Sequence, residues 1–181
     1  QVKVGLASGG VDMLDIVYVD DHNYDSAPLG TMTNGETYYI NVRVQDNLGN
    51  WSHTGDDETW YEGTFVYDVE GPVAPDDTTP TTGVAVVRGA TTTYYTNNKK
   101  PKIDWAEFTD ELSGMPATNA YEIKIGTSQD GDEITGGPEM VDSNTYTPNT
   151  ELNLKDGAPY FISVRAYDAL GNKSHADGDP W

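Results

Sequence analysis

Residues 38–53, with the sequence YYINVRVQDNLGNWSH, decide the fold because the chain contains this stretch twice. The second copy, YFISVRAYDALGNKSH, occupies residues 160–175. Ten of the sixteen positions are identical at a constant offset of 160 − 38 = 122 residues. An internal repeat at this spacing predicts two related structural units.

Each copy alternates apolar with polar side chains. In the first copy, Tyr38, Ile40 and Val42 fall on one face of an extended chain, and the residues between them fall on the other. Alternation of β-branched and aromatic residues predicts a half-buried β-strand. The motif Asp-x-Leu-Gly-Asn then predicts a tight turn, because Gly and Asn adopt positive φ readily.

The composition is acidic and lacks cysteine. Ten Lys and Arg face 30 Asp and Glu, which gives a formal charge of −20 and a pI near 4.1. This charge disfavours binding to nucleic acid or anionic membranes; it suits a protein that binds divalent cations or works in salty water, or simply a solvated acidic surface. Without cysteine there is no disulfide and no thiolate metal site. Few Lys, abundant Thr, Tyr, Gly and Asp, and no amphipathic helix together indicate an all-β, extracellular protein.

No apolar run approaches the roughly 18 residues that span a bilayer, and no signal peptide opens the chain, as expected of a mature or excised segment. Turn signals divide the chain into residues 1–71, a linker at 72–82 that contains three prolines, and residues 83–181. Proline stiffens such a linker. Many short strands separated by turns predict tandem antiparallel β-sandwiches. The predicted strands are residues 1–5, 14–19, 38–45, 61–67, 83–87, 101–105, 121–125, 145–147 and 160–167.

The second half resembles a fibronectin type III domain at residues 103–105 (IDW), 121–125 (YEIKI) and 154–160 (LKDGAPY). The resemblance is to the versions found in bacterial and archaeal surface proteins, and covers about residues 83–175 and part of 1–68. It implies that Trp105 packs in the core and that the Tyr160 hydroxyl bonds to upstream backbone as a tyrosine corner. In the first half this motif is MTNGETY, ending at Tyr38, with methionine in place of leucine.

The duplicated Asp-x-x-Gly-Asn-x-Ser turn, together with the sequence DDTTP in the linker, also resembles the tandem immunoglobulin-like repeats of large adhesins. In those proteins calcium commonly sits between neighbouring modules. The resemblance implies that Asp46, with Asp76 or Asp77, supplies oxygen ligands at the junction of the two units, and that Asp168 does so at the next junction. The alternative is that Asp46 and Asp168 only accept hydrogen bonds from amides in their own turns.

Other candidate sites are weaker. Trp51, Trp60 and Trp181 lie outside the predicted core, so a carbohydrate-binding surface is an alternative to shared packing at the end of each module. His53 and His175 recur at equivalent places and the chain has no Cys, so we expect no zinc site built from His and Cys within a unit. No carboxylate pair is fixed about a cleft as glycoside hydrolysis requires, and no phosphate loop or activated nucleophile is found, so we expect no enzyme activity.

The expected function is therefore that of a spacer or stalk repeat in an extracellular or cell-surface protein, stiffened by calcium, with neighbouring repeats as partners. A carbohydrate-binding accessory module is the second hypothesis. A third follows from the alignment of Gln1 with Glu122, which leaves the first unit without counterparts of residues 83–121. The strand at 61–67 likewise has no second copy. Either a longer array supplies these strands, or a neighbouring chain does so in a strand-exchanged filament.

Overall fold

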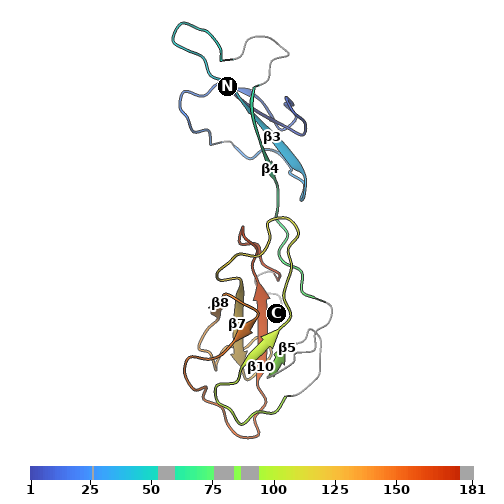
Figure 1. Ribbon diagram of the computed structural model, residues 1–181, viewed down its shortest axis with the longest axis vertical. Helices are drawn as coiled ribbons and strands as arrows, with labels where there is room; N and C mark the ends of the chain where they lie inside the picture. The colour runs from blue at the N-terminus through green and yellow to red at the C-terminus, as the bar shows by residue number, and fades with distance from the viewer. Residues whose placement is uncertain (26, 53–59, 76–83, 87–93, 176–181) are drawn as a thin grey trace. The chain divides into compact units, whose positions relative to one another are not determined.

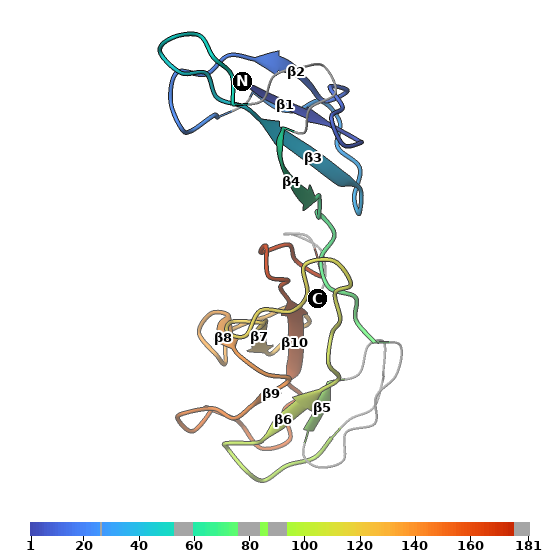
Figure 2. The same cartoon turned by 45° about the horizontal axis from the view of Figure 1, so that its top comes forward.

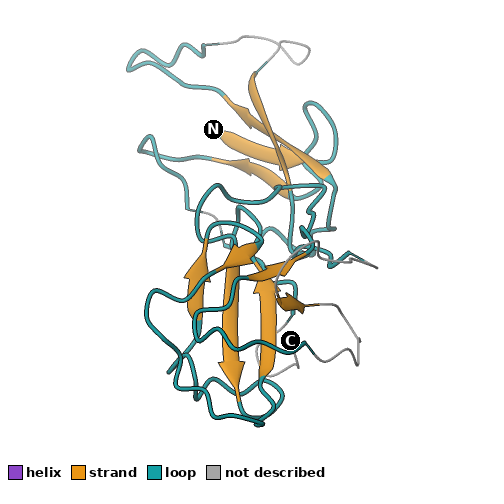
Figure 3. Ribbon diagram, turned by 60° about the horizontal axis from the view of Figure 1, so that its bottom comes forward, coloured by secondary structure: helices purple, strands orange, loops and turns teal. Residues whose placement is uncertain are grey.

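The computed structural model describes residues 1–25, 27–52, 60–75, 84–86 and 94–175, with backbone only for 84–86. The described residues form strands, turns and loops and no helix (Figure 3). The predicted all-β class is therefore confirmed. The chain divides into two compact units, Gln1–Val69 and Glu70–Trp181.

Ten strands follow one another in the described part of the chain. Four belong to the first unit: β1 (Val2–Gly5), β2 (Leu14–Val17), β3 (Thr37–Val42) and β4 (Tyr61–Val66). Six belong to the second unit: β5 (Val84–Val86), β6 (Ile103–Trp105), β7 (Tyr121–Gly126), β8 (Glu139–Val141), β9 (Thr145–Tyr146) and β10 (Phe161–Ala166).

The first unit is built on one antiparallel sheet in the order β2-β1-β3-β4 (Figure 2). The register pairs Val4 with Ile40, so the alternating apolar residues of both strands fall on one face. Val2, Val4 and Tyr38 on that face are buried. Among the described residues of this unit, no second sheet covers that face.

The second unit contains two three-stranded sheets, β10-β7-β8 and β5-β6-β9. Ile103 from one sheet and Ile123 from the other are both fully buried in a shared core, an arrangement consistent with a β-sandwich. Trp105 is 5% exposed and packs edge-on against Tyr121 with the ring centres 5.4 Å apart. The prediction that Trp105 lies in the core is confirmed.

The tyrosine corner is present in both units. The hydroxyl of Tyr38 accepts a hydrogen bond from the amide of Thr33 at 2.8 Å, and the hydroxyl of Tyr160 accepts one from the amide of Lys155 at 2.7 Å. The two tyrosines stand just before or within β3 and β10, the strands that contain the repeated sequence. The internal repeat is thus a repeat of local structure as well as of sequence.

Two features differ from the expectation. Strand β8 was not expected, because Glu139, Met140 and Val141 show no convincing alternation; pairing with β7 makes them a strand. Strand β5 pairs with β6 in parallel, whereas purely antiparallel sheets were expected.

The start of the predicted linker is paired with the second unit. The amide of Val73 donates to the carbonyl of Thr109 at 2.8 Å, and the amide of Thr109 donates back at 3.2 Å. Gly71 lies so close to Lys173 that a Cβ on Gly71 would sit 2.1 Å from the Lys173 carbonyl oxygen. Only glycine fits that contact, so the segment that enters the second unit is anchored there.

Candidate functional site

The repeated turn is organised around one carboxylate. In the first unit, Asp46 Oδ1 accepts hydrogen bonds from the amides of Leu48 and Asn50 at 2.9 and 2.8 Å, and Oδ2 accepts one from the side-chain amide of Asn50 at 2.9 Å. Gly49 has φ +89°, which glycine adopts without strain. The turn is exposed, and the Asn50 side-chain bond holds the pKa of Asp46 below its usual value.

The second unit repeats this turn in a buried setting. Asp168 Oδ1 accepts from the amides of Leu170 and Asn172 at 2.9 and 2.7 Å, and Oδ2 accepts from the side chain of Asn172 at 2.6 Å. Asp168 is only 2% exposed. Burial alone would raise its pKa, but the hydrogen bonds from Asn172 and Ser113 outweigh burial and lower it.

A second carboxylate, Asp110, lies beside Asp168. Asp110 Oδ1 accepts hydrogen bonds from the amides of residues 112–114 at 2.8–3.1 Å, and the Ala169 amide donates to the Gly114 carbonyl at 2.8 Å. This contact brings the two loops together, and one carboxylate oxygen of Asp110 lies within 4.8 Å of one of Asp168. Within the described residues the hydrogen bonds to Asp110 reach Oδ1 alone, which leaves Oδ2 for a ligand.

The four predicted metal ligands do not lie together in one described site. Asp46 and Asp168 are placed in different units, each at the centre of its own turn. Both carboxylates accept hydrogen bonds from amides of their own turns, which is the arrangement expected if these residues only stabilise the turns. Asp76 and Asp77 lie outside the described residues. Asp110 was not among the predicted ligands, although the Asp-x-x-Ser-Gly spacing from Asp110 to Gly114 is typical of a carboxylate that caps a turn.

Two tryptophans of the first unit contact cationic side chains. The Arg43 guanidinium lies 4.5 Å from the ring centres of both Trp51 and Trp60, and the Lys3 ammonium lies 4.4 Å from that of Trp60. Tyr18 packs against Trp51 with the ring centres 6.3 Å apart. Each tryptophan thus presents a ring face to a cation of its own unit, which favours packing over sugar binding at this place. Trp181 and His53 lie outside the described residues.

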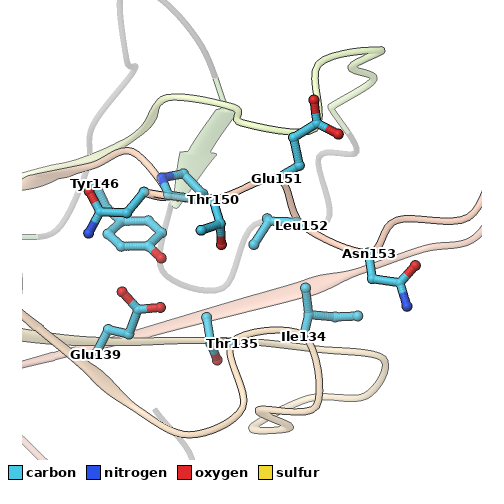
Figure 4. Close-up of a pocket in the computed structure, with 10 residues that line it drawn as sticks. Ile134, Thr135, Glu139, Tyr146, Thr150, Glu151, Leu152 and Asn153 are labelled. Carbon is cyan, nitrogen blue, oxygen red and sulfur yellow. The ribbon is translucent and has the colours of Figure 1, made fainter.

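A cavity of about 250 Å³ opens in the second unit between the start of β8 and the segment after β9 (Figure 4). Tyr146, which is 5% exposed, and Glu139 face the same space, and their side chains are hydrogen-bonded. Burial, reinforced by Glu139, raises the pKa of Tyr146, so the phenol stays protonated and donates to the carboxylate. The remaining lining residues are Ile134, Thr135, Pro148, Asn149, Thr150, Glu151, Leu152 and Asn153.

The chain matches no model of a known protein family, and no curated protein or solved structure is detectably similar to it. No membrane-spanning helix is found in the part of the chain that the structure describes.

Proposed function

We propose that this chain is a spacer or stalk element of an extracellular or cell-surface protein, with neighbouring repeats as its partners. The observation that supports this proposal is the repetition of one structural plan: the tyrosine corner and the carboxylate-centred turn occur with the same hydrogen bonds in two compact units. Repetition of one structural plan suits a mechanical role, because each unit can serve as a similar building block. The formal charge of −20 keeps such a surface soluble.

We further propose that calcium binds at Asp110 and Asp168 and stiffens the second unit. Two carboxylates this close together repel one another, and a divalent cation between them removes that repulsion. Carboxylate oxygens are among the ligands that calcium prefers, and each of the two loops supplies one carboxylate. Bridging the loops that carry Asp110 and Asp168 would restrict their relative motion.

Thermal unfolding with calcium or with a chelator tests the calcium site. An ion that binds only the folded chain stabilises it by about 2.7 kcal/mol at a free concentration one hundred times Kd. We therefore expect calcium to raise the Tm of the second unit by several degrees at low ionic strength. Coincident melting curves with calcium and chelator would refute the calcium site.

Matched variants locate the ion. We expect Asp110→Asn and Asp168→Asn to abolish most of the calcium-dependent shift, and Asp46→Asn, which changes the equivalent exposed turn, to preserve it. If Asp46→Asn removes the shift instead, the ion lies at the first turn, as the sequence resemblance implies.

A carbohydrate-binding module is the second candidate, favoured by the cavity beside Tyr146. Its volume accommodates one sugar ring, and Glu139, Asn149 and Asn153 offer the acceptors and donors that hydroxyl groups require. Glycan-array binding, repeated with Glu139→Gln, tests this candidate. We expect any cavity-bound sugar to lose at least about tenfold in affinity in this variant, whereas Trp51→Ala leaves binding unchanged. The reverse pattern would assign the sugar to the tryptophan surface.

A further inference from the structure

The loop before β3 contains Asn34 followed by Gly35, and this Asn-Gly pair occurs once in the chain. Asparagine followed by glycine is prone to deamidation, because the glycine nitrogen has no neighbouring side chain to hinder its approach to the asparagine side-chain amide. Asn34 is half-buried and Gly35 is exposed. Solvent therefore reaches this loop in the folded chain.

Deamidation of this pair would proceed through a cyclic imide. The Gly35 nitrogen loses its proton to a base in solution and attacks Cγ of Asn34, so that an N–Cγ bond forms, the Cγ–Nδ2 bond breaks and ammonia leaves. The imide then takes up one water molecule at either carbonyl. Opening at one carbonyl gives aspartate, and opening at the other gives isoaspartate, in which the main chain runs through Cβ and Cγ.

Both reacting groups are hydrogen-bonded to a single segment of the first unit. The Gly35 amide donates to the Tyr67 carbonyl at 2.8 Å, and Asn34 Oδ1 accepts a hydrogen bond from the Val69 amide at 2.9 Å. The nitrogen that must attack is thus held by a backbone bond, and the side chain that must turn toward it is held at its oxygen. Ring closure requires both groups to leave these partners.

The segment that holds them directly follows β4, which lies beside β3 (Figure 1). The Tyr67 amide donates to the Glu36 carbonyl at 3.1 Å, so residues 67–69 extend the β3–β4 pairing to the end of the first unit. Opening of this end of the ladder frees both reacting groups together. Local opening of this kind costs less free energy than global unfolding.

The second copy of the loop shows that aspartate fits at this position. Asp156-Gly157 occupies the place of Asn34-Gly35, at the offset of 156 − 34 = 122 residues. Gly157 has φ +71° and Gly35 has φ +76°, and in both loops a tyrosine hydroxyl accepts a hydrogen bond from the amide just before the pair. Isoaspartate differs from aspartate because it lengthens the main chain and displaces the glycine amide that follows it.

We propose that Asn34 is a deamidation site, kept unreacted by its bonds to residues 67–69 while the end of the first unit is closed. Opening of this segment exposes Asn34 to reaction. Conversion to isoaspartate then makes the opening persist, because the displaced Gly35 amide no longer reaches the Tyr67 carbonyl. This inference goes beyond the spacer function and does not depend on it.

The unaltered 181-residue chain and a synthetic peptide with the sequence of residues 30–39 give the first test. Both are incubated at mildly alkaline pH, and mass spectrometry of proteolytic fragments measures conversion at Asn34. We expect Asn34 to react at least about tenfold more slowly in the chain than in the peptide, because two hydrogen bonds must break before the ring closes. Equal rates in chain and peptide would overturn the proposal.

A matched pair of variants tests the bond from Val69. Val69→Pro removes the N–H that Asn34 accepts, and Val69→Ala keeps it. We expect Asn34 to deamidate about fivefold faster in Val69→Pro than in Val69→Ala, with tryptophan emission showing that both variants are folded. Equal rates in two folded variants would overturn the proposal.

Amide hydrogen exchange on the parent chain gives a test that needs no variant. Exchange at Gly35 and deamidation at Asn34 both require the Gly35 amide to leave the Tyr67 carbonyl. We therefore expect low concentrations of denaturant to accelerate both processes by the same factor, within about twofold. Faster exchange at Gly35 with an unchanged deamidation rate would overturn the proposal.

The purified products test the persistent opening. We expect the Val69 amide to exchange at least about threefold faster in the isoaspartate chain than in the parent, because its acceptor is displaced. Asn34→Asp, which reproduces the other product, is the control and should exchange at the rate of the parent. Equal exchange in the isoaspartate chain and in Asn34→Asp would overturn this part of the proposal.

Discussion

At the scale of single residues, Asp168 offers the sharpest test, because its carboxylate is buried yet ionised. Its pKa in the folded chain lies below the ordinary value of 3.8, so its ionisation stabilises the fold fully at neutral pH. That contribution is lost as the pH falls from about 3.8 through the folded-state pKa. We expect acidification over this range to lower the Tm of the parent chain more than that of Asp168→Asn, which carries no titrating group there.

Calorimetry between pH 7 and pH 2.5 in the presence of chelator measures this difference. At pH 7 we expect Asp168→Asn to cost about 1–2 kcal/mol, because the amide accepts hydrogen bonds less strongly than the carboxylate. Identical acid sensitivity in the two proteins would contradict the prediction.

The tyrosine corner and the repeated turn were predicted from the sequence because their partners are close along the chain. Tyr160 bonds to Lys155, five positions earlier, and the turn around Asp168 closes within four positions. Asp110 was missed because its neighbour Asp168 is 58 positions away (168 − 110 = 58), and only the folded chain brings their loops together.

At the scale of elements, the contacts of Arg43 with Trp51 and Trp60 join the end of β3 to two later segments of the first unit. We expect Arg43→Met, which retains much of the apolar stem and removes the charge, to lower the free energy of unfolding by about 1–2 kcal/mol, since two ring contacts disappear. Tryptophan emission followed through denaturant unfolding measures both stability and ring environment. Lys3→Met is the control, because the Lys3 ammonium contacts only one tryptophan ring in the described structure. An equal loss of unfolding free energy in the two variants would contradict the prediction.

The alternation of apolar and polar residues predicted the half-buried strands, but it did not predict β8. Strands β3 and β10 each have six residues; the predicted bounds of β10 are within one residue of the observed ones, and those of β3 within three. Strand β8 has three residues with no such period. Likewise, the parallel pairing of β5 with β6 depends on how the intervening chain returns, which residue type does not encode.

At the scale of the whole molecule, the two units differ in how much core protects their strands. In the second unit β7 lies between two neighbours and under a second sheet, and Ile123 is fully buried. The sheet of the first unit has no second sheet over it among the described residues, and Val44 is 61% exposed. The counterpart of Val44 in the repeat, Ala166, is fully buried.

We expect backbone amides of β7 to exchange with deuterium more slowly than those of the equivalent β1, because global opening of a larger core costs more free energy. Exchange followed residue by residue at neutral pH measures the difference, and Ile123 against Val2 and Ile125 against Val4 are the matched pairs. Equal exchange rates in the two strands would contradict this prediction, because β1 would then be protected as strongly as β7.

The close approach of Gly71 to Lys173 has a consequence for how the second unit transmits force. Because these residues touch, the polypeptide enters the unit and completes its last described turn at the same end. A force applied between Gly71 and Ser174 therefore acts across that end of the unit. The backbone hydrogen bonds between β7 and β10 do not carry this force.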